Sequence, residues 1–173
     1  MKIITAQLKK LLLLQKAWLV YGLAFFLPFL ISGPQWLTGT IVNCLLFLMV
    51  TRFSHKSISP VVILPSLGAI ANGILFGPQT VFLYYFLPFI WAGNYLLISV
   101  FSLTKNQPYF LRIVFAALAK YLLLVVFAQI YFGLKIVPQL FLVSMGTIQL
   151  LTALSGGTLA FIITQFSQKE KYE

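Results

Sequence analysis

Lys120 is the residue whose position in this sequence has the strongest chemical consequence. It stands near the centre of an apolar stretch, Pro108 to Phe132, which as a helix would be about 37 Å long. Its ammonium would then lie roughly 15 Å from either edge of a bilayer's hydrocarbon, whereas a lysine stem reaches only about 6 Å. Burying a cation at that depth costs about 2.5 kcal/mol or more, so Lys120 requires a partner or a wet cavity.

The apolar stretches hold no acid that could be this partner, because Glu170 and Glu173 are the only carboxylates and both lie in the last four residues. The alternatives are amide and backbone oxygens, a carboxylate from another subunit, loss of the proton through desolvation, or an anionic group on a bound ligand. All four remain open, and we hypothesise the last. Ala116, one helical turn before Lys120, would leave room for a cavity beside the ammonium.

Amides, hydroxyls and aromatic rings in other apolar stretches form a second set of candidates. Each amide alone is explained by a hydrogen bond to a neighbouring helix, which is worth about 0.6 kcal/mol in membranes. As a set they predict a shared cavity, open to the outer side and lined by Asn43, Asn94, Gln149 and the rings of Trp36 and Trp91. The candidate substrate-binding residues also include Lys120, Thr40, Thr152 and Asn72.

The sequence lacks the residue sets that catalysis inside a membrane requires, which are a nucleophile with a base or a metal held by His and carboxylates. The single histidine, His55, falls in a loop beside Arg52 and Lys56, and the single cysteine, Cys44, stands inside an apolar stretch. We therefore expect no enzyme, no metal site and no cofactor. We also expect no self-sufficient proton-coupled carrier, because no buried Asp, Glu or His is present to relay protons.

The elements that must position these residues are transmembrane helices. Hydrophobic residues make up 61% of the chain, charged residues 8%, and the mean hydropathy is +1.00, so its main solvent is lipid. We expect an all-α protein of the cell membrane, a compact bundle of six helices forming one domain over residues 1–173. The expected spans are Ala17–Ser32, Trp36–Thr51, Pro60–Leu75, Gln79–Phe101, Pro108–Phe132 and Pro138–Phe166. The second and third are short, and merging or re-entry of these two would leave four or five spans.

The distribution of positive charge predicts the orientation of the bundle. If six spans alternate, ten of the twelve Lys and Arg residues lie on the side of the N-terminus and only Lys135 lies opposite. The positive-inside rule then places both termini in the cytoplasm. The net charge of +10 reflects this topology, and we expect no binding of nucleic acid. The cationic start of the chain resembles a signal peptide, but it lacks a convincing cleavage site, so we expect a retained first helix.

Five short segments together resemble a known family. They are LTGTIVN at 37–43, PSLGA at 65–69, PFIWAGN at 88–94, AKY at 119–121 and QLLTALSGG at 149–157. In order and spacing, over residues 36–160, they are similar to the substrate-binding S-components of energy-coupling factor transporters, in a branch often labelled "iron hydrogenase". That label has no chemical basis here, because one cysteine cannot hold the iron–sulfur clusters of a hydrogenase.

The resemblance implies a six-helix subunit that captures a vitamin or another small nutrient from outside the cell. Such a subunit delivers its solute by toppling within a complex of a transmembrane coupling subunit and two cytoplasmic ATPases. The absence of a Walker A sequence fits this division of labour. Many S-components dock through an Ala-x-x-x-Ala pair on the first span, whereas here Ala17 is followed four residues on by Tyr21. The alternative function is a non-transporting structural or accessory membrane subunit, whose polar residues only join helices.

Overall fold

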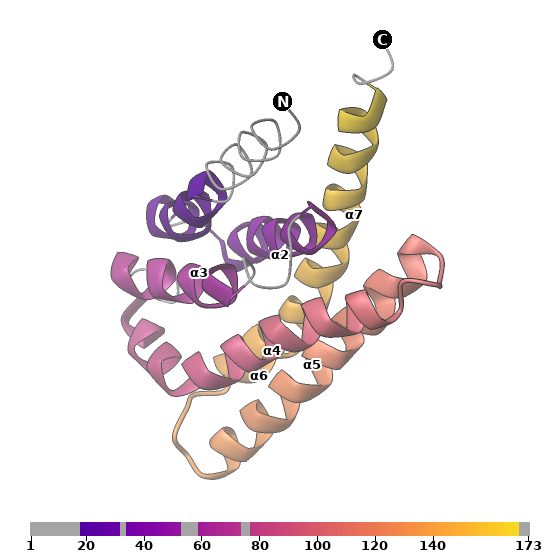
Figure 1. The fold of residues 1–173 in the computed structure, drawn as a ribbon. Coiled ribbons are helices and arrows are strands. Elements are labelled where there is room, and N and C mark those ends of the chain that lie inside the picture. Colours follow the sequence, from indigo (N-terminus) through magenta and orange to yellow (C-terminus); the bar gives the residue numbers. More distant parts are fainter. Residues whose placement is uncertain (1–17, 32–33, 53–58, 74–76, 170–173) are drawn as a thin grey trace.

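The computed structural model describes residues 18–31, 34–52, 59–73 and 77–169, and all of their regular secondary structure is helical (Figure 1). The chain forms a helix over Trp18–Leu30, then α2 (Gln35–Arg52), α3 (Ser59–Asn72), the 3-10 helix η2 (Gly77–Phe82), α4 (Leu83–Leu103), α5 (Tyr109–Gly133), α6 (Leu140–Met145) and α7 (Thr147–Lys169). The predicted all-α class is confirmed for the described residues.

Three helical segments are long and apolar enough to cross a membrane: Thr80–Leu103, Tyr109–Gly133 and Leu140–Ser167. The other three apolar helices, Trp18–Leu30, Gln35–Thr51 and Pro60–Asn72, have only 10–17 residues each. The helices at Gln35–Thr51 and Pro60–Asn72 are separate, as in the six-segment interpretation, and are not merged into one.

Proline and glycine set the ends of these helices, as the sequence pattern predicts. Pro108 is the N-cap of α5, where its missing N–H removes no helical hydrogen bond. Gly73 follows the last residue of α3 with φ +75°, a left-handed conformation that ends a helix without steric cost for glycine. The turn between α4 and α5 is closed by a hydrogen bond from the N–H of Gln107 to the carbonyl of Thr104.

The sixth predicted span, Pro138–Phe166, is not one continuous α-helix. It is interrupted at Gly146, which has φ −100° and ψ −106° and separates α6 from α7. A Cβ at this position would lie 2.5 Å from the carbonyl oxygen of Leu142, so the break accommodates only a glycine without rearrangement. Met145 and Gln149 lie on opposite sides of this break.

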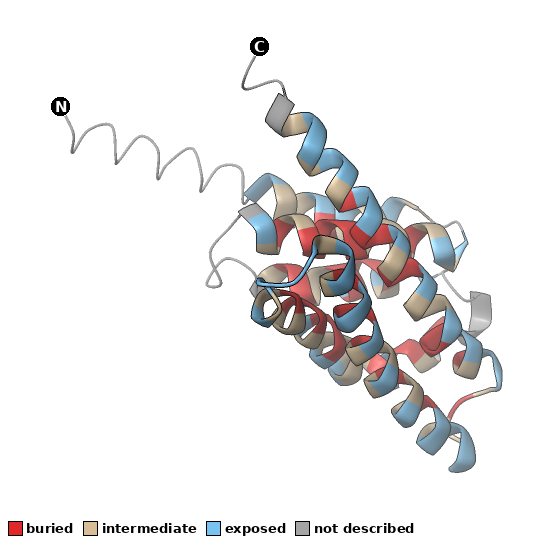
Figure 2. Cartoon of the chain, turned by 90° about the vertical axis from the view of Figure 1, so that its right-hand side faces the viewer, coloured by how far each residue is buried: buried red, intermediate tan, exposed pale blue. Residues whose placement is uncertain are grey.

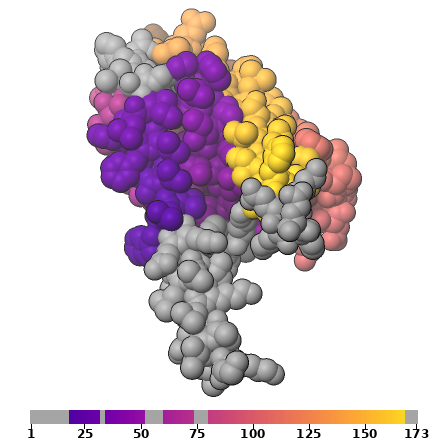
Figure 3. Space-filling model, turned by 90° about the horizontal axis from the view of Figure 1, so that it is seen from above, coloured from indigo at the N-terminus to yellow at the C-terminus, as the bar shows by residue number. Residues whose placement is uncertain are grey.

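The bundle is organised around α7, which packs against both α2 and α5, while α4 runs beside α5 (Figure 1). Seen from above, α7 lies between the N-terminal helices and the chain near residue 110 (Figure 3). Glycines allow the closest approach: a Cβ on Gly156 would lie 2.7 Å from the carbonyl oxygen of Thr40 on α2. A Cβ on Gly157 would lie 2.6 Å from the Ile113 side chain on α5.

The interior and the surface are both apolar. Buried side chains such as Phe47, Phe101 and Ile113 gather in one cluster, and Phe86 and Phe141 in another. Burial is confined to the facing sides of the helices, and the outward sides are exposed (Figure 2). Many of those outward residues are large Leu, Ile, Val and Phe side chains. An apolar surface of this extent is suited to lipid.

Candidate ligand-binding site

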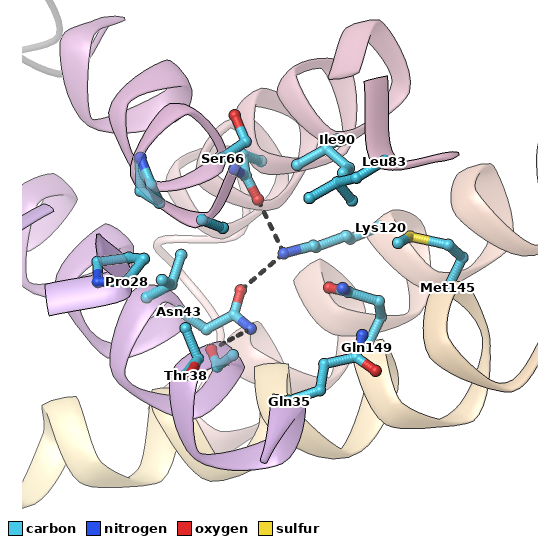
Figure 4. Close-up of a pocket in the computed structure, with 15 residues that line it drawn as sticks. Pro28, Gln35, Thr38, Asn43, Ser66, Leu83, Ile90, Lys120, Met145 and Gln149 are labelled. Carbon is cyan, nitrogen blue, oxygen red and sulfur yellow. Dashed lines mark hydrogen bonds between the residues drawn. The ribbon is translucent and has the colours of Figure 1, made fainter. Parts of the chain in front are cut away.

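Lys120 lies inside the bundle and is held by two asparagines from two other helices. Its Nζ donates a hydrogen bond of 2.8 Å to Asn43 Oδ1 on α2 and a second of 2.8 Å to Asn94 Oδ1 on α4 (Figure 4). All three residues are at most 2% exposed. Helices α2, α4 and α5 therefore meet at one buried ammonium group.

Neighbouring groups orient both amides so that their oxygens face the lysine. Asn43 Nδ2 donates to the carbonyl oxygen of Gly39 at 2.9 Å and to Thr152 Oγ1 at 3.2 Å. Asn94 Nδ2 donates to the carbonyl oxygen of Val62 on α3 at 3.0 Å. With the amide nitrogens used in this way, each oxygen is left as the acceptor that an ammonium requires.

A proline and a glycine lie next to this arrangement. Pro65 inside α3 has no N–H and leaves the carbonyl of Val61 without its helical partner, next to the Val62 carbonyl that Asn94 contacts. Gly93 lies beside the lysine stem, since a Cβ there would be 3.3 Å from Lys120 Cγ. Gly93 thus leaves room for the lysine stem, and the next residue, Asn94, provides a hydrogen-bond acceptor for its amino group.

A cavity of about 80 Å³ adjoins the ammonium. It lies among α2, α3, α4, α5 and the α6–α7 break, with polar side chains from several of these elements around it (Figure 4). On α2 the lining residues fall at helical spacing, so that one face of that helix forms a wall. The lining residues are Pro28, Gln35, Thr38, Gly39, Val42, Asn43, Pro65, Ser66, Ala69, Leu83, Ile90, Asn94, Lys120, Met145 and Gln149.

Some polar groups of the wall are already bonded and others are not. Gln35 Nε2 donates to the carbonyl oxygen of Ser144 at 2.9 Å, next to the α6–α7 break. Ser66 Oγ donates to the Ile63 carbonyl and accepts from Trp91 Nε1 at 2.7 Å. By contrast, the buried Thr38 hydroxyl has no hydrogen-bond partner among the described residues, and the Gln149 side chain forms no bond there either. These unpaired groups are available to a molecule in the cavity.

Lys120 is the ionisable group of the site, and no counter-charge lies beside it among the described residues. The described residues include no Asp or Glu. Arg112, the next cation along α5, donates through Nε and Nη2 to the Phe101 carbonyl at 3.1 and 3.0 Å and stacks on the Phe101 ring. Since amide oxygens carry only partial negative charge, Lys120 keeps a field that attracts an anion.

The structure brings together four of the residues selected from the sequence: Lys120, Asn43, Asn94 and Gln149 all line the cavity. Thr152 lies one layer behind them, where its hydroxyl accepts the bond from Asn43 and donates to the Gln149 carbonyl at 3.2 Å.

The expected placement of both tryptophans in the cavity is wrong. Trp36 is 60% exposed, and the Trp91 indole donates to Ser66 behind the wall. Each tryptophan adjoins a lining residue, Gln35 or Ile90, but successive residues of a helix are rotated by about 100°, so the rings point elsewhere.

Thr40, Asn72 and Ala116 also lie outside the cavity wall. Thr40 bonds the carbonyl of Trp36 within its own helix, and Asn72 donates to the Phe29 carbonyl at 2.7 Å, joining α3 to the first described helix. Ala116, expected to leave room beside the ammonium, is fully buried in the core cluster. Space beside the lysine comes instead from Gly93 on α4.

The candidate binding residues chosen from the sequence did not include Gln35, Thr38, Ser66 and Gly93. A signal for the first two exists: Gln35, Thr38, Gly39, Val42 and Asn43 are spaced as one helical face, so extending that face back from Asn43 finds them. Ser66 and Gly93 carry no such signal, because their roles come from contacts between helices.

Some residues named in the sequence analysis lie outside the described residues. They are Ala17 and the lysines before it, His55, Lys56, Glu170 and Glu173. Within the described residues, no group of three or more His, Cys, Asp or Glu side chains could hold a metal ion. Cys44 is buried and unpaired in the core.

Comparisons with known proteins do not extend this description. No protein-family model matches the chain, and neither a curated protein nor a solved structure shows significant similarity to it.

Proposed function

We propose that this chain is the substrate-binding membrane subunit of an ATP-driven importer of the energy-coupling factor type. It captures a vitamin-like or other small nutrient in the cavity beside Lys120 and relies on a transmembrane coupling subunit and cytoplasmic ATPases for transport. In this proposal the chain is not itself an enzyme.

The observation that carries the proposal is the Lys120–Asn43–Asn94 cluster at the wall of a cavity. A charged group inside an apolar helical bundle is costly, and in membrane proteins such groups mark binding sites and pathways. The interrupted helix α6–α7 beside the cavity adds support, because broken helices in transporters lie where a solute binds.

The proposed arrangement in the cell membrane is six spans with both termini in the cytoplasm. Three helices have the length and composition to span, and the three shorter ones, held beside them, would complete the bundle. Exposed apolar side chains around the helices would face lipid. The excess of cations on the N-terminal side supports the orientation.

We predict that an impermeant thiol reagent applied to intact cells labels a cysteine at position 135 and not one at position 169. Lys135 is exposed in the turn after α5, and Lys169 ends α7, so the two report opposite sides of the proposed bundle. Cys44 is first replaced by alanine to remove the native thiol. Labelling of Lys169→Cys on intact cells, or equal labelling of both positions, would contradict the topology.

Ligand capture and dependence on partners are predicted together. The purified chain should carry a small molecule at a near one-to-one ratio whose removal lowers the thermal midpoint. Reconstituted alone in vesicles, it should not concentrate that molecule against its gradient, and uptake should appear only with the coupling subunit, ATPases and ATP.

Two results would contradict this prediction in different ways. An empty bundle that no small molecule stabilises would favour a structural or accessory subunit. Accumulation by the chain alone would replace the importer-subunit proposal with an autonomous carrier.

A further inference from the structure

We propose that the solute bound beside Lys120 is a small organic monoanion recognised through its carboxylate, and that Asn43 and Asn94 hold the lysine in place. This inference rests on the proposed function and names the substrate class of the same site.

The charge of the cavity wall favours a monoanion. Of the described residues that line the cavity, only Lys120 has a basic or acidic side chain. The described part of the chain offers it no carboxylate. A neutral or cationic solute would leave the buried ammonium uncompensated, whereas one carboxylate would neutralise it and form a charge-assisted hydrogen bond.

The hydrogen-bonding capacity left at the site matches a carboxylate. An ammonium has three protons, and Asn43 and Asn94 accept two of those on Lys120, so one is left. Thr38, which is only 5% exposed, lines the same cavity, and its buried hydroxyl has no partner among the described residues. The amide of Gln149 adds further donors. Two carboxylate oxygens can accept bonds from all three side chains.

Both asparagines already hold the lysine, and only one of their amide protons, on Asn94 Nδ2, is left over. Their amide nitrogens donate to Gly39, Thr152 and Val62, and their oxygens accept from the lysine. They are positioning residues, because they accept two protons of Lys120 and thereby aim the third. As neutral acceptors they do not compensate a positive charge on the lysine.

The size of the cavity limits the rest of the molecule. Its volume is about 80 Å³, and a protein cavity of roughly 150 Å³ holds benzene. Side chains of Leu83, Ile90 and Met145 form the apolar part of the wall. A carboxylate with a short apolar stem, such as propionate, fits both the volume and the lining.

The first test uses propionate and propionamide, which have the same shape and differ in charge. The full-length chain is purified in detergent without solute, and its thermal midpoint is measured with each compound and with chloride. At hundredfold excess over Kd, propionate should raise the midpoint by about 5 °C or more. Propionamide and chloride should leave it unchanged.

Each contrary result of that test overturns the inference. Equal shifts with propionamide would show a neutral ligand class, and equal shifts with chloride would show that a carboxylate is not required. No shift with propionate would exclude the short monocarboxylate. None of these results touches the importer-subunit proposal, which fails only if no solute of any class is captured.

The second test places a carboxylate beside Lys120 within the protein. Asn94→Asp keeps the volume of the side chain and neutralises the ammonium, so it should weaken propionate binding by roughly 30-fold or more. Asn106→Asp, in the exposed turn between α4 and α5, adds the same charge away from the cavity and should bind propionate normally. Wild-type affinity in Asn94→Asp would overturn the inference.

Thr38→Val keeps the test decisive if Asn94→Asp fails to fold. Valine has the shape of threonine without its unpaired buried hydroxyl, so the empty protein should become more stable. Propionate should bind about tenfold more weakly, because a hydrogen bond to its charged oxygen is lost. A stabilised variant with unchanged affinity would overturn the assignment of Thr38 as a donor to the carboxylate.

Discussion

Lys120→Met is expected to abolish solute binding in a protein that still folds and inserts. Methionine keeps the length of the stem and removes the ammonium, so the partner of a carboxylate is lost and affinity should fall by roughly 30-fold or more. The oxygens of Asn43 and Asn94 lose a donor, at a cost of about 1 to 3 kcal/mol each, while removal of an uncompensated buried charge offsets that cost. The thermal midpoint of the empty protein should therefore change little.

Lys120→Arg separates the need for a charge from the need for this geometry. The guanidinium keeps the positive charge but is larger and flat, and the stem already lies in close contact with Gly93. We expect weaker binding and a lower midpoint than in the wild type. Lys105→Met, in the exposed turn after α4, is the matched control and should change neither property. Wild-type affinity in Lys120→Met would remove this residue from the site.

Gly156→Ala is expected to produce the largest loss of stability among single-methyl changes on α7. Its Cβ would lie 2.7 Å from the carbonyl oxygen of Thr40, 2.8 Å from Asn43 Cβ and 2.8 Å from the backbone nitrogen of Cys44. Two of these atoms belong to the α2 backbone and cannot move independently, so α2 and α7 must separate. Overpacking of this kind costs about 3 kcal/mol, measured as a lower thermal midpoint.

Gly22→Ala is the control for this change. Gly22 also lies in a helix, but a Cβ there would meet no described atom within 4 Å. Helix propensity then favours alanine by up to about 1 kcal/mol, and the midpoint should stay constant or rise. Because Asn43 moves with α2, Gly156→Ala should also weaken solute binding. A Gly156→Ala protein as stable as Gly22→Ala would contradict the close approach of α2 and α7.

The helical class could be predicted from composition because long apolar stretches punctuated by proline and glycine have few other solutions. The buried position of Lys120 could be predicted in the same way, from its distance to both ends of one apolar stretch. Both inferences depend on properties local to one segment, and local properties are what a single sequence records.

Which groups meet Lys120 could not be predicted with the same certainty, because its partners are 77 and 26 residues away along the chain. Amides on several apolar stretches were candidates, and only helix packing selects Asn43 and Asn94 while leaving Asn72 at another interface. The tryptophans show the same limit: a rotation of about 100° per residue sends a ring out of a cavity that its neighbour lines.

The sequence by itself determined that a cation would be buried among apolar helices with no acid beside it. Only the tertiary structure decided that two amides hold it, that α2 turns the face with Thr38 toward it, and that α7 begins at a break next to it. The reason is physical: the periodicity of a helix determines which residues share a face, but close contacts between glycines and neighbouring helices determine which faces meet.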